Sequence, residues 1–233
     1  MIPMAASTPA RLLSVWLPNW PCQRVRNLLQ PPHLTTQPSN ELAPLVLSAR
    51  DARRGLIVAA ACRMARSLGI RPQMSLSEAI GLSQRAGHNL HQRFNPTATT
   101  PSTTPASSRL ELQVVEHDPQ EDLERLCQLA EEAQRFSPIV GLEPLGPKPW
   151  AGIHLFQPQG LMLDIRGLGP LFGGEKQLAQ QLGQWLASYG YQAVIAIADT
   201  VGAAWALSRY GWRIHIHTPT DTSTTNQPTK ADG

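Results

Sequence analysis

The chain has 233 residues, enough for one large domain or two small ones with a hydrophobic core. Only 16% of the residues are charged and 21 are proline; an average globular protein is roughly 25% charged. This composition predicts a compact, rather apolar folded part joined by linkers. The net charge of +3 would suit a polyanionic partner but does not require one.

Cysteine spacing and hydropathy exclude several classes of protein. The three cysteines, Cys22, Cys62 and Cys127, share no metal-ligand or CxxC spacing, so we expect free, buried thiols in a reducing compartment. The first apolar run, residues 12–17, ends at Pro18. It is too short for a signal peptide and far short of the ~18 residues of a membrane helix. We therefore expect a soluble, cytoplasmic protein.

Apolar runs alternate with amphipathic segments, so we expect an α+β fold in which helices pack on a mixed sheet. In chain order, the pattern predicts a strand at 12–17, a helix at 21–29, strands at 45–48 and 56–60, helices at 61–68, from 75 and at 119–133, a strand at 160–165, a helix from 175, a strand at 193–198 and a helix at 201–210. Stretches rich in Pro, Thr and Ser predict loops or linkers at 30–43, 96–108 and 218–233.

Local signals mark where several of these helices begin. A capping box opens at Ser75, Asp118 precedes a proline at a first helical position, and Asp199 or Thr200 caps the last helix. The helix after Asp118 has apolar residues at helical spacing, which predicts that one face is buried. The positions on that face are Leu123, Leu126, Cys127, Ala130 and Ala133.

Four motifs occur in order along residues 11–212. They read VWLPNWPCQRVR from Val15, GLMLDI from Gly160, LFGGE from Leu171 and AIADTVGAAWALSRYG from Ala196. In this form and order they resemble the N-terminal half of the ImuB-like group of Y-family (UmuC-like) DNA polymerase homologues. The resemblance implies a polymerase palm with a small fingers subdomain.

The same resemblance implies a division of the chain. Residues 11–84 would hold the first palm strand and the fingers-like region, and 85–109 a disordered Thr/Pro/Ser linker. The rest of the palm-like domain would be 110–217, followed by a disordered tail at 218–233. Since no thumb, little-finger domain or clamp-binding segment is evident after His217, we expect a short form, a fragment or one half of a split gene.

An active polymerase of this family holds two Mg²⁺ ions with carboxylates. By the resemblance, the first acid falls on Trp16, the next on Pro18, and the paired acids near Glu143 and Pro144. Glu143 would be the one residual acid of a degenerate metal site, so we expect no catalytic residue, no bound metal and no cofactor. Asp164 matches an acid that is not a metal ligand in active relatives, and we interpret it as structural.

The contacts expected for a nucleoside triphosphate are half present. A Tyr-x-x-Arg pair grips the phosphates in active relatives, and here its positions hold Arg63 and Arg66. The phosphate-binding lysine of the last helix has no counterpart near Asp199 and Val201. Because an acid repels phosphate, the resemblance implies weakened nucleotide binding.

Positive charge is concentrated in the fingers-like region, where only Asp51 opposes it. These side chains could contact DNA phosphates, which adds affinity without reading sequence, or they could form an ordinary solvated surface. The six arginines are Arg50, Arg53, Arg54, Arg63, Arg66 and Arg71.

Three further patterns have plain structural explanations. His215 and His217 lie on one face of a predicted strand, but no Cys or acid partner completes a metal site. Gly173 and Gly174 could cradle a phosphate, yet the acid that follows favours a tight turn. We interpret the tryptophans as packing residues rather than base-stacking platforms.

These observations favour one hypothesis and leave two alternatives. The favoured hypothesis is a non-catalytic polymerase-like scaffold or adaptor in DNA repair, acting in damage-induced (SOS) translesion synthesis. By resemblance, its partners would be DNA, the sliding clamp, an error-prone polymerase subunit and a RecA-like accessory protein. The alternatives are an active nucleotidyltransferase with relocated carboxylates, such as Glu143 and Asp164, and a vestigial folded fragment.

Overall fold

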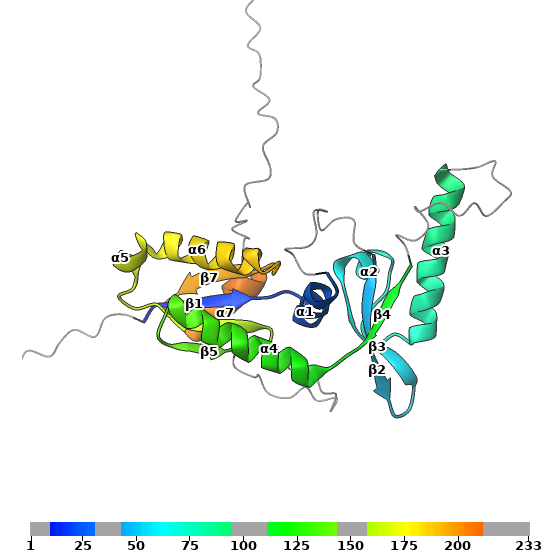
Figure 1. The fold of residues 1–233 in the computed structure, drawn as a ribbon, viewed down its shortest axis with the longest axis horizontal. Coiled ribbons are helices and arrows are strands. Elements are labelled where there is room, and N and C mark those ends of the chain that lie inside the picture. Colours follow the sequence, from blue (N-terminus) through cyan, green and yellow to red (C-terminus); the bar gives the residue numbers. More distant parts are fainter. Residues whose placement is uncertain (1–9, 31–42, 95–110, 144–157, 212–233) are drawn as a thin grey trace, which may run out of the picture.

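A computed structural model describes residues 10–30, 43–94, 111–143 and 158–211, with the backbone alone at 87–94. The described chain forms two β-sheets, each with its own hydrophobic core. Helix α1 (Trp20–Leu29) lies between the two sheets (Figure 1). The predicted mixture of helices and sheets is confirmed.

The larger sheet is antiparallel throughout and has the strand order β5-β6-β1-β7. Its register places Trp16, at the end of β1, opposite Gly160 of β6 and Val194 of β7. The sheet therefore gathers segments that are far apart in the sequence. Its strands are β1 (Leu12–Trp16), β5 (Val140–Leu142), β6 (Gly160–Asp164) and β7 (Val194–Ala198).

Helices cover both faces of this sheet. Successive strand residues point to opposite faces, so Leu13 and Val15 share a core with α4 and α6, while Ser14 faces α7. The Ser14 and Ser208 hydroxyls are 3.0 Å apart there. The helices are α4 (Pro119–Glu132), α6 (Glu175–Ser188) and α7 (Val201–Tyr210), with the short turns η3 (Ala133–Arg135) and α5 (Gly169–Phe172) beside them.

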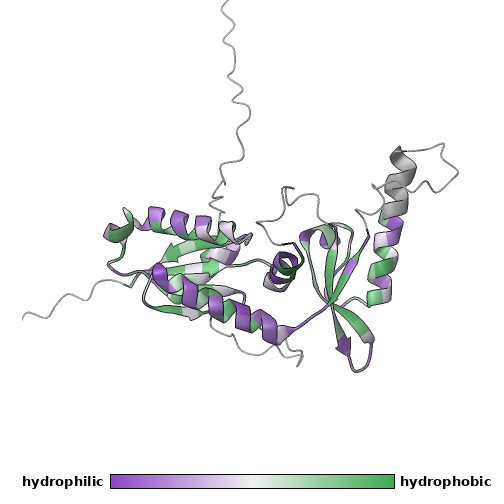
Figure 2. Ribbon diagram, viewed as in Figure 1, coloured by the Kyte–Doolittle hydropathy of each residue, from purple (hydrophilic) through white to green (hydrophobic). Residues whose placement is uncertain are grey.

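The smaller sheet has the order β3-β2-β4, with β2 and β3 forming a hairpin and β4 parallel to β2. Strands β2 and β3 are mostly apolar where they line the second core, and polar residues occupy the hairpin end of β2 (Figure 2). Its elements are β2 (Leu45–Asp51), β3 (Gly55–Ala61), α2 (Arg63–Ser67), α3 (Leu76–Phe94) and β4 (Gln113–Glu116).

The helix start signals are confirmed by hydrogen bonds. Ser75 Oγ accepts from the backbone N–H of Glu78 at 3.2 Å, and Asp118 accepts from two backbone N–H groups of the first turn of α4. Thr200, rather than Asp199, caps α7, because its hydroxyl accepts from Ala203 N at 3.2 Å.

One expectation about the cysteines is wrong. Cys22 and Cys62 are buried, and burial raises the pKa of the Cys22 thiol to about 12. Cys127, however, is exposed, and Leu129 takes the buried position on α4 instead. Cys127 has the right helical spacing for the buried stripe but lies at its edge, where α4 turns toward solvent.

Two boundaries differ from the expected division of the chain. Helix α3 continues through Phe94, so residues 85–94, which were expected to begin the disordered linker, are helical. Strand β4 pairs with β2 of the small sheet, although it falls in the segment assigned to the rest of the palm. The linker at 96–108, the strand with His215 and His217, and the tail at 218–233 lie outside the described residues. Among the helices that the structure describes, none is long and apolar enough to cross a membrane.

Candidate functional site

Two of the positions expected to carry metal ligands meet at one end of the larger sheet. Trp16 ends β1 and pairs with Gly160, the first residue of β6. Glu143 directly follows β5 on the other side of β6, and its backbone N–H donates to Gly160 O at 2.8 Å. Trp16 and Glu143 therefore lie on either side of Gly160. Pro18 lies just beyond β1 and is half-buried, and Pro144 lies outside the described residues.

Gly160 leaves no room for a side chain between them. A Cβ atom built on Gly160 would lie 2.2 Å from the carbonyl oxygen of Val15, a distance that no real Cβ contact reaches. The obstacle is backbone, which cannot swing aside as a flexible side chain can. A third side chain, acidic or otherwise, therefore cannot enter the sheet at this position.

Arg209, in the last turn of α7, fills the space beside Glu143. Its guanidinium carbon lies 4.6 Å from the ring centre of Trp205 and 5.4 Å from that of Trp16. Its Nη2 lies 2.5 Å from Glu143 Oε1. A guanidinium over a tryptophan face is attracted by the ring quadrupole, so both indoles and the carboxylate stabilise the same cation.

Both oxygens of Glu143 have partners. Oε1 also accepts from Trp205 Nε1 at 2.7 Å, and Oε2 accepts from the backbone N–H of Gln159 at 2.9 Å. The side chains of Arg209 and Glu143 are only 11% and 14% exposed. Burial lowers the pKa of Arg209, the nearby carboxylate of Glu143 acts in the opposite direction, and an arginine stays protonated in proteins.

These residues do not fit the two Mg²⁺ ions of a nucleotidyl-transfer centre. Each ion takes an octahedral set of oxygen ligands and usually one or two carboxylates. The centre offers one carboxylate, already paired, beside a cation and an indole with no ligand atom. In the described parts of the chain, no group of three or more His, Cys, Asp and Glu side chains could hold a metal ion.

Asp164 lies at the far end of β6 from Gly160 and pairs with Leu12 at the start of β1. Its carboxylate accepts two hydrogen bonds from Arg166 Nε, at 3.0 and 2.9 Å, and one from Nη2 at 2.5 Å. These bonds lower the pKa of Asp164. These contacts agree with a structural role for Asp164. Because it lies at the opposite end of β6, it is not part of the site around Glu143.

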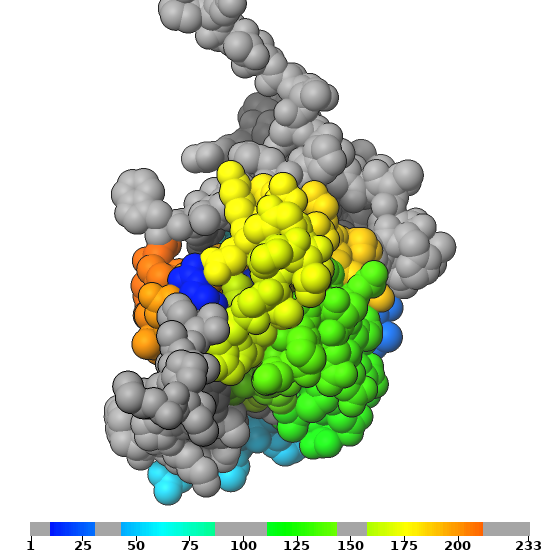
Figure 3. Space-filling model, turned by 90° about the vertical axis from the view of Figure 1, so that its left-hand side faces the viewer, coloured from blue at the N-terminus to red at the C-terminus, as the bar shows by residue number. Residues whose placement is uncertain are grey.

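The LFGGE and AIADT motifs meet at the start of β1. Arg11 forms an ion pair with Glu175 and a second one, at 2.7 Å, with Asp199. The hydrogen bond to Glu175, and to a lesser extent the one to Asp199, raises the pKa of Arg11. The hydrogen bond from Arg11 lowers the pKa of Glu175. Figure 3 shows the blue start of the described chain between α7 and the α5–α6 segment. Gly173 and Gly174 have φ angles of 80° and 121°, as the expected tight turn requires.

The six arginines of the fingers-like region are all exposed but do not form one compact cluster. Three lie at the hairpin turn between β2 and β3, two on α2, and one in the loop after α2. Strand β3 separates the turn from α2 by about 20 Å. Asp51 offsets part of the hairpin charge: it lies 3.5 Å from the Arg54 guanidinium and accepts the backbone N–H groups of Arg53 and Arg54, which lowers its pKa and keeps it ionised.

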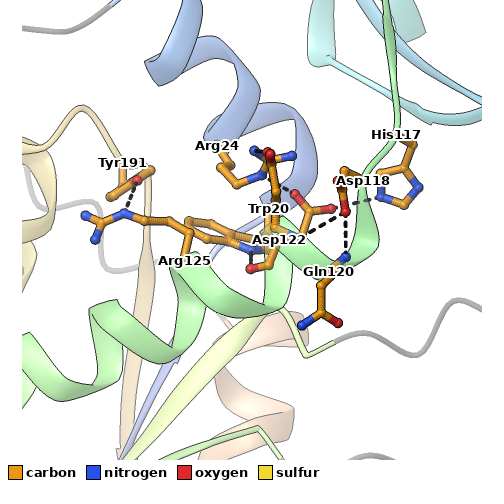
Figure 4. A network of polar contacts seen from close by, with 9 residues as sticks. Trp20, Arg24, His117, Asp118, Gln120, Asp122, Arg125 and Tyr191 are labelled. Atoms are coloured by element: carbon orange, nitrogen blue, oxygen red, sulfur yellow. Dashed lines mark hydrogen bonds and ion pairs between the residues drawn. The ribbon is translucent and has the colours of Figure 1, made fainter.

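A buried polar network joins α1 to the start of α4, as Figure 4 shows. Arg24 donates to Asp122 at 2.5 Å and to Glu121 at 2.6 Å, and His117 Nε2 lies 2.9 Å from Asp122. Trp20 Nε1 donates to the Asp122 carbonyl at 2.8 Å. Burial acts to lower the pKa of Arg24, but its bonds to Asp122 and Glu121 outweigh burial and raise it. The network ties the two sheets together because His117 directly follows β4.

The rest of the first motif also serves this joint. Asn19 has a left-handed φ of 57° and donates to Ala61 O at 2.9 Å, and Arg66 Nη2 donates to Asn19 Oδ1 at 3.3 Å. Gln23 exchanges hydrogen bonds with the backbone of Gln192 at 3.0 and 2.7 Å. This N-terminal motif therefore connects the larger sheet to the smaller one.

Sequence reasoning missed the role of Trp205 and Arg209. Their i, i+4 spacing places both on one face of a helix, which was the one available signal. Their partners, Trp16 and Glu143, are 193 and 66 residues away from Arg209, so nothing local indicates the contact.

Comparison with known proteins gives two kinds of similarity. No protein-family model matches the chain. In sequence, the chain is 38% identical to Protein ImuB from two strains of Caulobacter vibrioides over 109 residues, which is 47% of this chain and 21% of each relative. The chain thus matches only a minor part of the length of these relatives.

In fold, the chain is similar to DinB from Sulfolobus solfataricus, with a TM-score of 0.53 and 14% identity. A post-insertion binary complex of Dbh DNA polymerase gives 0.53 and 13%. Each similarity covers 85% of this chain and 45% of the solved chain. At this identity the structures establish the fold alone. The chain therefore has the fold of the Y-family DNA polymerases, and over 109 of its residues it is similar in sequence to Protein ImuB.

Proposed function

We propose that this protein is a non-catalytic Y-family polymerase-like scaffold, acting in the cytoplasm in damage-induced translesion synthesis. The observation that supports it best is the arrangement at the end of the larger sheet. There Trp16 lies where the resemblance places the first acid, and Arg209 pairs with Glu143 and stacks on Trp16 and Trp205. The fold is that of a polymerase, but this site lacks the carboxylates that would hold metal ions for phosphoryl transfer.

The scaffold would use surfaces other than this centre. The exposed arginines of the small subdomain would contact DNA phosphates, and the protein would bring an error-prone polymerase subunit, a RecA-like accessory protein and the sliding clamp together. These partners follow from the resemblance to ImuB. They are proposals, since the match covers only 21% of the relatives' length.

A primer-extension assay tests the catalytic part of the proposal. We expect no template-dependent incorporation with Mg²⁺ or Mn²⁺, and no difference between the wild type and Glu143→Ala. Incorporation that disappears in Glu143→Ala would mean an active nucleotidyltransferase with relocated carboxylates. The geometry opposes that outcome, because Glu143 is held by three donors and Asp164 is held by Arg166 at the far end of β6.

A pull-down from damage-treated cells tests the scaffold part. We expect the tagged protein to retain the clamp or a polymerase subunit, with undamaged cells as the reference. Retention of neither, together with no DNA binding, would favour a vestigial folded fragment.

A further inference from the structure

We infer that Arg209 is the resident cation of the degenerate centre: its guanidinium takes the place that divalent metal ions hold in an active polymerase, and it fastens α7 to the far edge of the palm sheet. This inference builds on the positions that the proposed function assigns to Trp16 and Glu143. It fails separately, because a catalytically dead centre could equally be loose, hydrated and without any cation.

The position of Arg209 supports the inference first. The resemblance places expected acids at Trp16, on one side of β6, and at Glu143, on the other. Here Arg209 pairs with Glu143 at 2.5 Å and stacks 5.4 Å from the ring of Trp16, the two residues that flank Gly160. The guanidinium thus contacts Trp16 and Glu143, two of the three expected acid positions that the structure describes.

The environment of the guanidinium is arranged for a cation. Trp205 contributes its ring face to Arg209 at 4.6 Å and its N–H to Glu143 at 2.7 Å, so one indole supports both members of the ion pair. The backbone N–H of Gln159 satisfies the second oxygen of Glu143. A nearly buried charge pair with its remaining lone pairs satisfied is the arrangement in which Coulomb attraction offsets desolvation.

The pair also has a mechanical consequence. Helix α7 packs on β1 and β7, whereas Glu143 follows β5 at the opposite edge of the sheet. The contact between Arg209 and Glu143 therefore connects the helix across the sheet. Because Arg209 is part of the chain, this link cannot dissociate as a bound ion could.

A double-mutant cycle measures the proposed pair. In urea unfolding, Arg209→Met and Glu143→Gln should each raise the unfolding equilibrium constant by about 100-fold to 1,000-fold, because each leaves a nearly buried partner unpaired. The double variant should show a coupling of about tenfold. The matched control is the pair of Arg166 and Asp164 on the same sheet, where Arg166 is 50% exposed and little coupling is expected.

Rescue by a small cation distinguishes a cation site from ordinary packing. Millimolar, non-denaturing guanidinium chloride should raise the Tm of Arg209→Ala, while leaving the wild type and Arg166→Ala unchanged. MgCl₂ at equal ionic strength should rescue none of the three. Guanidinium fits the two indole faces and the carboxylate, whereas Mg²⁺ requires oxygen ligands that the centre lacks.

The wild type provides a readout if the variants do not fold. Its Trp205 indole N–H resonance, assigned through Trp205→Phe, should not move when Mg²⁺ is added, since Glu143 is already paired. A shift of that resonance at stoichiometric Mg²⁺ would overturn the inference. So would the absence of coupling between Arg209 and Glu143, or equal rescue of Arg209→Ala by sodium chloride.

Discussion

At the scale of single residues, Gly160 decides how closely Trp16 and Glu143 approach each other. The carbonyl of Val15 lies where a Cβ of residue 160 would be, so the strands pass one another at this point without an intervening side chain. On the other side of β6, the backbone N–H of Glu143 donates to Gly160 O, which holds Glu143 next to the same residue. An acidic side chain introduced at residue 160 would therefore not fit between the strands.

Gly160→Ala should therefore destabilise the protein. The added methyl group meets backbone, and overpacking of this kind costs about 1–3 kcal/mol. The measurement is urea unfolding followed by tryptophan fluorescence. Gly141→Ala is the matched control, because Gly141 also lies in this sheet and a Cβ there meets nothing within 4 Å. Equal stability of the two variants would contradict the steric explanation.

At the scale of elements, the molecule depends on connections between segments that the sequence separates widely. Arg11 links β1 to the starts of α6 and α7 through Glu175 and Asp199, and Arg24 links α1 to α4 through Asp122. Each link uses an arginine of the N-terminal segment and an acid at or near a helix start. The N-terminal motif thus holds later elements in place.

Asp122→Ala should weaken the joint between the sheets. It leaves the nearly buried guanidinium of Arg24 without its main partner and removes the contact with His117. Breaking a buried pair from one side costs about 3–5 kcal/mol, which urea unfolding would measure. Glu121→Ala is the control: Glu121 also pairs with Arg24 but is 58% exposed, so its loss should cost at most about 1 kcal/mol. A larger loss for Glu121→Ala than for Asp122→Ala would reverse this account of the joint.

The link through Glu175 predicts acid sensitivity. Arg11 lowers the pKa of Glu175 in the folded state, so the folded protein holds fewer protons there than the unfolded chain. The stabilisation is fully present above the ordinary carboxyl pKa of about 4.3 and is lost as pH falls through the lower folded value. Thermal unfolding across this range should show a smaller loss of Tm on acidification in Glu175→Gln than in the wild type. Parallel curves for the two proteins would rule out this link.

The sequence predicted most elements but few of their contacts. Apolar runs and capping residues such as Ser75, Asp118 and Thr200 identified the long helices and strands, because those signals are local. Strands β4 and β5 were not predicted, since four and three residues carry too little periodicity. Arg209 was overlooked for a different reason: its role arises only when α7 packs across the sheet and meets Glu143.

At the scale of the whole molecule, two subdomains of different character share one chain. The larger sheet carries the nearly buried pair of Arg209 and Glu143, and the smaller one carries exposed arginines at the β2–β3 turn and on α2. The chain covers 45% of the length of the solved polymerases that it resembles in fold. If this region binds DNA, the smaller subdomain is the part whose charge favours it.

Replacing Arg63 and Arg66 together by Ala should weaken binding to duplex DNA without changing sequence preference. Each phosphate contact contributes a slope of about −0.9 in the dependence of log affinity on log salt, so losing two contacts should reduce the slope by about 2. A mobility-shift titration at several salt concentrations gives both quantities. The charge-matched control, Arg135→Ala with Lys176→Ala, removes two exposed cations from the larger subdomain. Unchanged affinity and slope in the Arg63 and Arg66 variant would remove α2 from the DNA-contacting surface.

The central claim is that the polymerase fold is retained here around a centre that has its own cation and takes no divalent ion. A count of bound Mn²⁺ by electron paramagnetic resonance tests it most directly, because free Mn²⁺ gives a six-line spectrum that is lost on binding. We expect the wild type to leave the free-ion signal unchanged at equimolar Mn²⁺, as Glu143→Ala should. One or two equivalents of tightly bound Mn²⁺ in the wild type, released in Glu143→Ala, would contradict the claim.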